Sequence, residues 1–140
     1  MNIKTICVAT MVTAVTATQA MALTYEVRVS SPLMVSAAAG FKTGQADGSL
    51  RPTFMAEAGI GGGKLSVGMD NIGEGAFGYG VKAAFLRTWI EPLDVDADVS
   101  YLGVDGEFSV KRLIFSLGGY RRISSGDDDW IVNAGLGFRF

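Results

Sequence analysis

The chain has 140 residues, 12 of them basic and 14 acidic, and it contains 19 glycines, one cysteine and no histidine. This length supports a single domain, and a formal net charge of −2 does not suggest a nucleic-acid-binding protein. The lack of histidine excludes Ser-His-Asp catalysis and other histidine-based acid–base chemistry.

Residues 1–22 are predicted to be a cleaved signal peptide for secretion. Lys4 is its only charge, an apolar run with interspersed threonines covers residues 6–17, and Ala20-Met21-Ala22 is a small-x-small cleavage site. The apolar run is shorter than the roughly 20 residues that a membrane-spanning helix needs. The alternative is an N-terminal helix buried in the folded protein.

The expected mature chain is one domain, residues 23–140. The single cysteine, Cys7, lies in the signal segment, so the mature chain has no thiol for disulfides, nucleophilic catalysis or metal ligation. It also has no long apolar helix. If it crosses a membrane it must do so as a closed β-barrel, because a bilayer cannot satisfy the hydrogen bonds of an open sheet edge.

Apolar and polar residues alternate along most of the mature chain, which is the period of a β-strand with two different faces. The eight expected strands are residues 24–30, 34–42, 51–60, 64–70, 76–90, 96–110, 113–122 and 130–140. Turn-forming residues separate them, such as the glycines at 61–63 and the polar residues at 43–50. We therefore predict an all-β fold, a single closed antiparallel up-and-down barrel of about eight transmembrane strands.

The last segment, residues 130–140, shows the alternation most clearly. One face is apolar and the other small or polar, with Ile131 the exception. The apolar face comprises Trp130, Val132, Ala134, Leu136, Phe138 and Phe140. A terminal amphipathic strand that ends in Phe resembles the closing strand of bacterial outer-membrane β-barrels, and the mature chain as a whole resembles the small OmpA- and OmpX-like barrels.

This resemblance implies a location in the outer membrane of a Gram-negative cell, reached through the periplasm after signal cleavage. It implies contact with outer-membrane lipid and lipopolysaccharide, and recognition of the C-terminal strand by the barrel assembly machinery. It also implies a monomer without a cofactor, in which both termini face the periplasm.

Alternation alone does not decide which face points outward, because a soluble lipocalin-like or streptavidin-like barrel has the same period. The polar face here is rich in Gly, Ser and Ala and has few charges, which favours the crowded interior of a narrow membrane barrel. Six charges are expected inside, where they can pair across the lumen: Glu57, Lys64, Lys82, Asp105, Glu107 and Arg139.

Aromatic and basic residues are expected near the two membrane interfaces. An aromatic girdle is predicted from Trp89, Tyr120 and Trp130 at the outer interface and from Tyr25, Phe138 and Phe140 at the inner one. Arg87, Arg121 and Arg122 lie close to the outer rim. They are candidates for contacts with lipopolysaccharide phosphates, or they simply extend their charges to the interface.

No catalytic, cofactor or metal residue is assigned. Asp94-x-Asp96-x-Asp98 opens like a calcium loop with Asp105 at the twelfth position, but the sixth position is Val99 instead of Gly. A solvated acidic rim, which includes residues 127–129, is the favoured interpretation over a divalent-cation site.

Glu57 and Glu107 could form a glycosidase-like carboxylate pair, although ion pairing inside the barrel is favoured. The leading hypothesis is a non-enzymatic structural or surface protein whose lumen is filled by its own side chains. The first alternative is a narrow pore for ions or small solutes. The second is a soluble periplasmic barrel that binds an apolar ligand.

Overall fold

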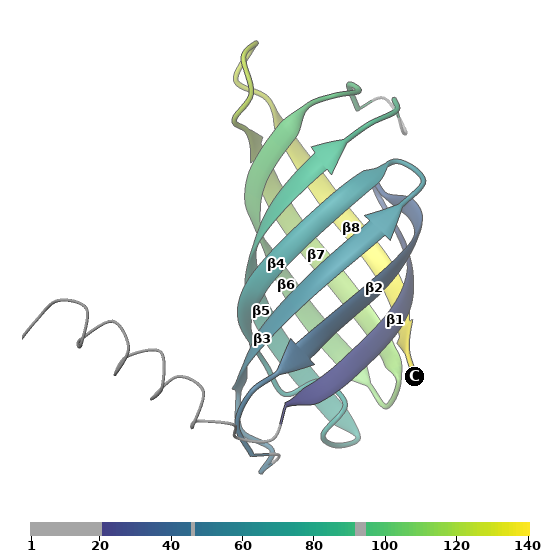
Figure 1. The fold of residues 1–140 in the computed structure, drawn as a ribbon, viewed down its shortest axis with the longest axis vertical. Helices are drawn as coiled ribbons and strands as arrows, with labels where there is room; N and C mark the ends of the chain where they lie inside the picture. Colours follow the sequence, from purple (N-terminus) through teal and green to yellow (C-terminus); the bar gives the residue numbers. More distant parts are fainter. Residues whose placement is uncertain (1–20, 46, 92–94) are drawn as a thin grey trace, which may run out of the picture.

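The computed structural model describes residues 21–45, 47–91 and 95–140, so the predicted signal segment lies outside the described residues apart from Met21 and Ala22. The described chain forms one closed barrel (Figure 1). In the part of the chain that the structure describes, no helix is long and apolar enough to cross a membrane.

Eight antiparallel strands form the wall, each paired with the next in sequence, and β8 pairs with β1 to close it. The strands are β1 Ala22–Ser30, β2 Met34–Lys42, β3 Arg51–Gly59, β4 Gly62–Asp70, β5 Phe77–Thr88, β6 Ser100–Val110, β7 Leu113–Arg122 and β8 Trp130–Arg139. This topology confirms the predicted all-β class and the closed barrel of eight strands.

The predicted boundaries agree at both ends of β2 and β7 and differ elsewhere by a few residues. The largest difference is at β6, which begins at Ser100 instead of residue 96. Asp98 has a φ of 56°, in the left-handed region, which departs from the extended backbone of a strand interior. At 61–63, the predicted tight turn is shorter, since Gly62 and Gly63 already belong to β4.

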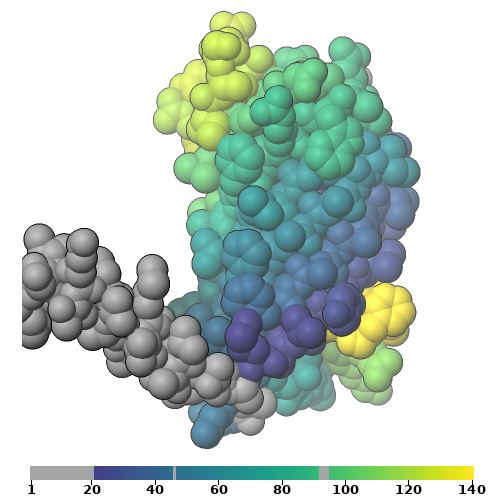
Figure 2. All heavy atoms as spheres, viewed as in Figure 1, coloured from purple at the N-terminus to yellow at the C-terminus, as the bar shows by residue number. Residues whose placement is uncertain are grey.

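The connections gather at two rims. The terminal rim comprises the start of β1, the end of β8 and the connections 43–50, 71–76 and 111–112. The distal rim comprises the connections 31–33, 60–61 and 123–129 and the described residues of the connection 89–99. Figure 1 shows the start of β1 and the C-terminus at the same end of the barrel, and Figure 2 shows the C-terminal residues beside the start of β1.

Strand alternation separates an apolar outer surface from a charged interior. Along β5, exposed and buried residues alternate without a break from Phe77 to Thr88. Outward side chains are apolar and exposed, as in Val81 at 61% and Leu117 at 64%, whereas Lys82 is only 1% exposed. This distribution is the reverse of a water-soluble barrel, in which the apolar face is buried.

Inward glycines make room for large charged neighbours. A Cβ atom on Gly80 would collide with the side chain of Asp70, and one on Gly118 would collide with the carboxylate of Asp105. The abundant glycine of the polar face is therefore a packing requirement of the interior.

Gly118 and Gly119, neighbours on β7, provide a direct test of this crowding. At Gly118 a Cβ would meet Asp105 Oδ1 and lie 2.8 Å from the carbonyl oxygen of Val104, whereas at Gly119 it would meet nothing within 4 Å. We expect Gly118→Ala to lower the free energy of unfolding by about 1–3 kcal/mol through overpacking. Gly119→Ala should change it by less than about 1 kcal/mol. Urea unfolding in detergent micelles, followed by tryptophan fluorescence, measures both, and equal effects would contradict the crowded interior.

Candidate functional site

Within the described residues, the interior of the barrel holds six cationic and five anionic side chains, each 6% exposed or less. They are Glu26, Arg28, Lys42, Arg51, Glu57, Lys64, Asp70, Lys82, Asp105, Glu107 and Arg139. Seven of the eight strands contribute, and β7 is the exception. The sixth cation, Arg51, lies 2.8 Å from Glu74 of the 71–76 connection, whose side chain is 8% exposed, so it too has a partner of opposite charge.

Seven of these groups form one chain of ion pairs in which the sign alternates. Lys82 Nζ lies 3.1 Å from Asp70 and 2.5 Å from Glu107, and Glu107 lies 2.8 Å from Arg28. Asp70 also pairs with Lys42, and Arg28 pairs with Glu26. The order is therefore Lys42, Asp70, Lys82, Glu107, Arg28, Glu26 and Arg139.

Three further charged groups form a second cluster around Asp105, and Arg51 pairs separately with Glu74. Lys64 Nζ lies 3.1 Å from both Glu57 and Asp105. Asp105 also accepts hydrogen bonds from Tyr120 Oη at 2.5 Å and from Asn133 Nδ2 at 3.1 Å. One carboxylate thus ties together side chains from β4, β6, β7 and β8. A buried carboxylate needs such donors, since each unmet lone pair would cost free energy.

Tyr120 is a correction to the predicted aromatic girdle. Its side chain is fully buried inside the barrel, not exposed at an outer interface. Tyr120 follows Ser116 and Gly118 at even spacing on β7, so alternation points it inward. Its hydroxyl reaches Asp105, which supplies the polar partner that a buried tyrosine needs.

All six charges predicted for the lumen lie inside the barrel. Five further charged residues lie there too and were missing from that prediction: Glu26, Arg28, Lys42, Arg51 and Asp70. The signal that could have found them was the alternation itself, because each occupies the polar face of its predicted strand. What alternation does not provide is the pairing, which depends on contacts across the lumen.

An apolar cluster fills the interior toward the distal rim. Leu33, Leu86, Val99, Tyr101 and Tyr120 are each 3% exposed or less and pack together. Leu33 comes from the 31–33 connection and Val99 from the 89–99 connection, so two distal connections help to fill the barrel. Val95 and Ile131 pack against the same cluster.

A connection also enters the barrel at the terminal rim. Ile72, in the 71–76 connection, is 1% exposed. Its carbonyl oxygen accepts hydrogen bonds from Lys42 Nζ and Arg139 Nη1, each at 2.5 Å, and its amide donates to Asp70 Oδ1 at 3.1 Å. The end of the ion-pair chain is therefore anchored to a loop that covers this end of the lumen.

The three rim arginines each face an aspartate of a distal connection. Arg121 donates to Asp128 from Nε at 2.7 Å and from Nη2 at 2.5 Å. Arg122 donates to Asp96 at 3.0 Å. Arg87 lies 3.9 Å from Asp98. Their positions at the distal rim agree with the sequence pattern, and nothing in these contacts tests the predicted lipopolysaccharide binding.

The acidic rim does not gather into a metal centre in the described part of the chain, where no group of three or more suitable ligands occurs. Asp94, the first position of the calcium-like spacing, lies outside the described residues. Asp96 is paired with Arg122 and Asp98 with Arg87, which leaves these carboxylates in ion pairs with the chain's own cations.

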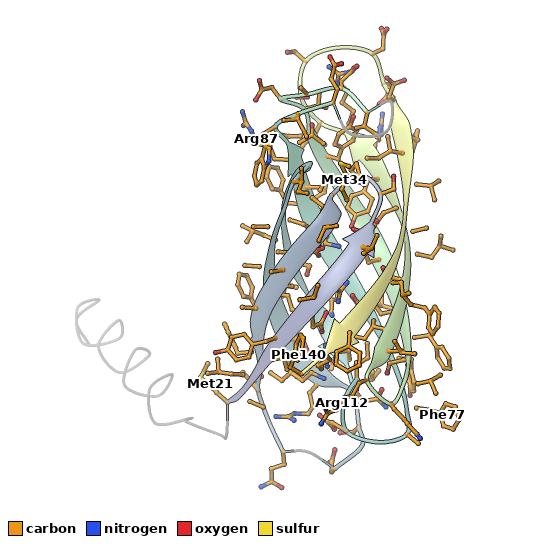
Figure 3. All side chains as sticks on the ribbon, turned by 90° about the vertical axis from the view of Figure 1, so that its right-hand side faces the viewer. Met21, Met34, Phe77, Arg87, Arg112 and Phe140 are labelled. Carbon is orange, nitrogen blue, oxygen red and sulfur yellow. The ribbon has the colours of Figure 1, made fainter. Side chains whose placement is uncertain are left out.

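The other girdle residues lie on the outer surface. At the distal end are Trp89, 47% exposed, and Trp130, 69% exposed. At the terminal end Phe138 and Phe140 meet edge to face with ring centroids 5.3 Å apart. Tyr25 is 55% exposed. Further outward aromatics that the predicted girdle did not include are Phe54, Phe77, Tyr79, Phe85, Phe108 and Phe115. Figure 3 shows Phe77 and Phe140 at the terminal end.

Comparison of the chain with protein-family models, with curated proteins and with solved structures finds no match. Any functional conclusion therefore depends on the fold, on the inverted distribution of charge and on the filled interior.

Removing one charge from the ion-pair chain should destabilise the barrel. Lys82→Met leaves Asp70 and Glu107 with one cation fewer, and breaking a buried pair in this way costs about 3–5 kcal/mol. The control is Arg87→Met at the distal rim. The Arg87 side chain is 58% exposed, and its pair contributes at most about 1 kcal/mol. Urea unfolding in micelles measures the free energy of unfolding of both variants. A smaller decrease in Lys82→Met than in Arg87→Met would contradict a stabilising role of the ion-pair chain.

The exposed Arg121–Asp128 pair predicts a local titration. The hydrogen bonds from Arg121 lower the pKa of the Asp128 carboxyl below its ordinary value. A depressed carboxyl pKa means that the pair is intact at neutral pH and is lost as the pH falls through the lowered pKa. We expect Arg121→Gln to raise the pKa of Asp128, as followed by carboxyl ¹³C NMR, whereas Arg87→Gln leaves it unchanged. An Asp128 pKa that does not move in Arg121→Gln would show that the pair is absent in solution.

Proposed function

We propose that the chain is a non-enzymatic integral membrane β-barrel of the bacterial outer membrane, with a structural or surface role. The observation that carries this proposal is the inversion of the two faces. Within the described residues, eleven charged side chains lie buried inside the wall, whereas apolar side chains such as Val81, Val104 and Val132 are 53–68% exposed outside it. In water this surface would be a large exposed apolar area, which soluble monomers avoid. In a bilayer it meets lipid.

The architecture supports the same proposal. The strands have 9 to 12 residues, close to the roughly 9–11 of a tilted membrane-spanning strand. Closure through the β1–β8 pairing leaves no strand edge unpaired, which is the condition for a sheet in hydrocarbon. Exposed aromatic residues near both rims suit the two membrane–water interfaces.

The outer membrane is proposed on the evidence of the sequence. The predicted signal segment and the terminal Phe140 resemble features of outer-membrane barrels. In that family, the assembly machinery recognises the C-terminal strand. The start of β1 and the end of β8 lie at one rim, so the terminal rim would face the periplasm and the distal rim the exterior. Lipid and lipopolysaccharide are then the expected contacts, and a monomer is the expected state.

A filled lumen favours a structural role over conduction. Three barriers lie in series along the barrel: Ile72 with its hydrogen-bonded loop, the paired charges, and the apolar cluster around Leu33 and Tyr101. A pore needs a continuous hydrated path, and a carrier of apolar ligands needs an apolar cavity. Glu57 and Glu107 are both engaged in ion pairs, which favours a structural role for the carboxylates as well.

The experiment that tests the membrane location is migration on a detergent gel, with the membrane fraction run boiled and unboiled. A closed barrel in outer membranes should give an unboiled band that migrates faster than the boiled one. A single unshifted band in the soluble periplasmic fraction would overturn the proposal and would lead to a screen for soluble ligands.

Planar-bilayer recording tests the filled lumen. We expect the wild-type barrel to give no stable conductance steps, because the ion pairs of Lys82 and Glu107 and the apolar cluster block the axis. Insertion is checked independently by the gel shift of the same preparation. Steady conductance in the wild type, with an ion selectivity that changes in Lys82→Met or Glu107→Gln, would contradict the filled lumen and favour the narrow pore.

A further inference from the structure

A hollow of about 420 Å³ opens on the terminal rim between the 71–76 connection and the turn that joins β6 to β7. It is lined by Gly73, Gly75 and Ala76 of the connection, by Lys111 and Arg112 of the turn, and by Arg139 and Phe140. The amide of Lys111 donates a hydrogen bond to the carbonyl oxygen of Ala76 at 2.7 Å, which joins the turn to the connection. Figure 3 labels Arg112 and Phe140 at this end of the barrel.

Cationic side chains dominate this hollow. Lys111 and Arg112 are exposed, and within the described residues neither forms an ion pair. Glu74 lies between Gly73 and Gly75 in the sequence, but its side chain does not line the hollow. Its carboxylate instead forms an ion pair with Arg51 at 2.8 Å. No acidic side chain of the described residues lines the hollow, and the backbone carboxylate of Phe140 forms no ion pair with Lys111 or Arg112.

The two rims differ in how their cations are partnered. At the distal rim, Arg87, Arg121 and Arg122 each face an aspartate. At the terminal rim, Arg51 is paired with Glu74, whereas Lys111 and Arg112 face the hollow. The interior reinforces this difference, because the seven-member ion-pair chain has one more cation than anions. Both of its ends, Lys42 and Arg139, lie where β2 and β8 reach the terminal rim.

The surroundings define the kind of anion that would fit. Phe140 is 71% exposed beside the hollow, and Phe77 is 68% exposed on the outer wall at the same end. A ligand there would have its charge between Lys111 and Arg112 and its apolar part against outward aromatics. A phospholipid has this combination of a charged phosphate headgroup and apolar acyl chains. Cations near a membrane surface attract such headgroups.

We propose that this hollow binds the phosphate headgroup of an anionic phospholipid in the membrane leaflet at the terminal rim, with Lys111 and Arg112 as its main contacts. This inference rests on the proposed membrane location. Arg139 also lines the hollow and adds positive potential to it. Its hydrogen bonds are donated to Glu26 and to the Ile72 carbonyl oxygen, so it is not a main contact.

The test compares lipid retention by native mass spectrometry of the purified mature chain. Micelles contain equimolar phosphatidylglycerol and phosphatidylcholine. The variant is Lys111→Asn with Arg112→Gln; Asn is chosen because Lys111 has a φ of 56°, which Asn tolerates well. The matched control is Arg87→Gln with Arg121→Gln, which removes two cations from the distal rim.

The wild type should retain phosphatidylglycerol over phosphatidylcholine by about tenfold or more, since each cation at a membrane surface contributes about fivefold. The Lys111/Arg112 variant should fall close to parity, and the distal control should keep the preference. An excess of inorganic phosphate should not displace the lipid, because it lacks the acyl chains that contact the aromatics.

Three results would overturn the inference. Equal lipid preference in the wild type and the Lys111/Arg112 variant would show that these cations do not select the lipid. Displacement by inorganic phosphate would assign the hollow to the free ion. A chain that gives no heat-dependent gel shift in membranes would remove the proposed function and this inference together, whereas a shifted band without lipid preference would remove the inference alone.

Discussion

The fold depends on the requirement that every charge inside a narrow barrel must find a partner within it. A buried, unpaired charge is costly in a region that water cannot fill. Here six cations meet this requirement by pairing with five buried anions and with Glu74, and the contacts join strands that are not neighbours in the wall, as Lys64 of β4 does with Asp105 of β6. Backbone hydrogen bonds hold the wall together, and the ion pairs hold its opposite sides at a fixed separation.

Other features of the interior follow from this requirement. Long charged side chains occupy space, so the positions beside them are Gly or Ser, as Gly118 is beside Asp105. Where the charges end, other side chains must exclude water. Ile72 does so toward the terminal rim, and the cluster around Leu86 does so toward the distal rim. A lumen organised in this way provides rigidity and a stable outer surface, which is what a structural envelope protein needs.

Much of this architecture could be predicted because strand alternation is a local property. The number of strands, their order and the inward position of Lys82 and Glu107 all follow from a period of two. Tyr120 shows where residue type misleads, since a tyrosine near a rim resembles a girdle residue while its place in the alternation points inward. The seven-member chain of ion pairs and the entry of Ile72 into the lumen could not be predicted. Both arise from contacts between residues far apart in sequence, including Glu26 and Arg139.

The ion pair between Glu26 and Arg139 joins the first strand of the barrel to the last. These residues are also direct neighbours in the β1–β8 register, where only five residue pairs close the ring, compared with eleven between β5 and β6. A slip of one residue at this seam would turn Arg139 outward, and a slip of two in one direction would place it opposite Arg28, a like charge. The ion pair therefore favours the correct register at the shortest pairing in the wall. Glu26 already pairs with Arg28, and it pairs with Arg139 as well only when β8 is correctly aligned with β1.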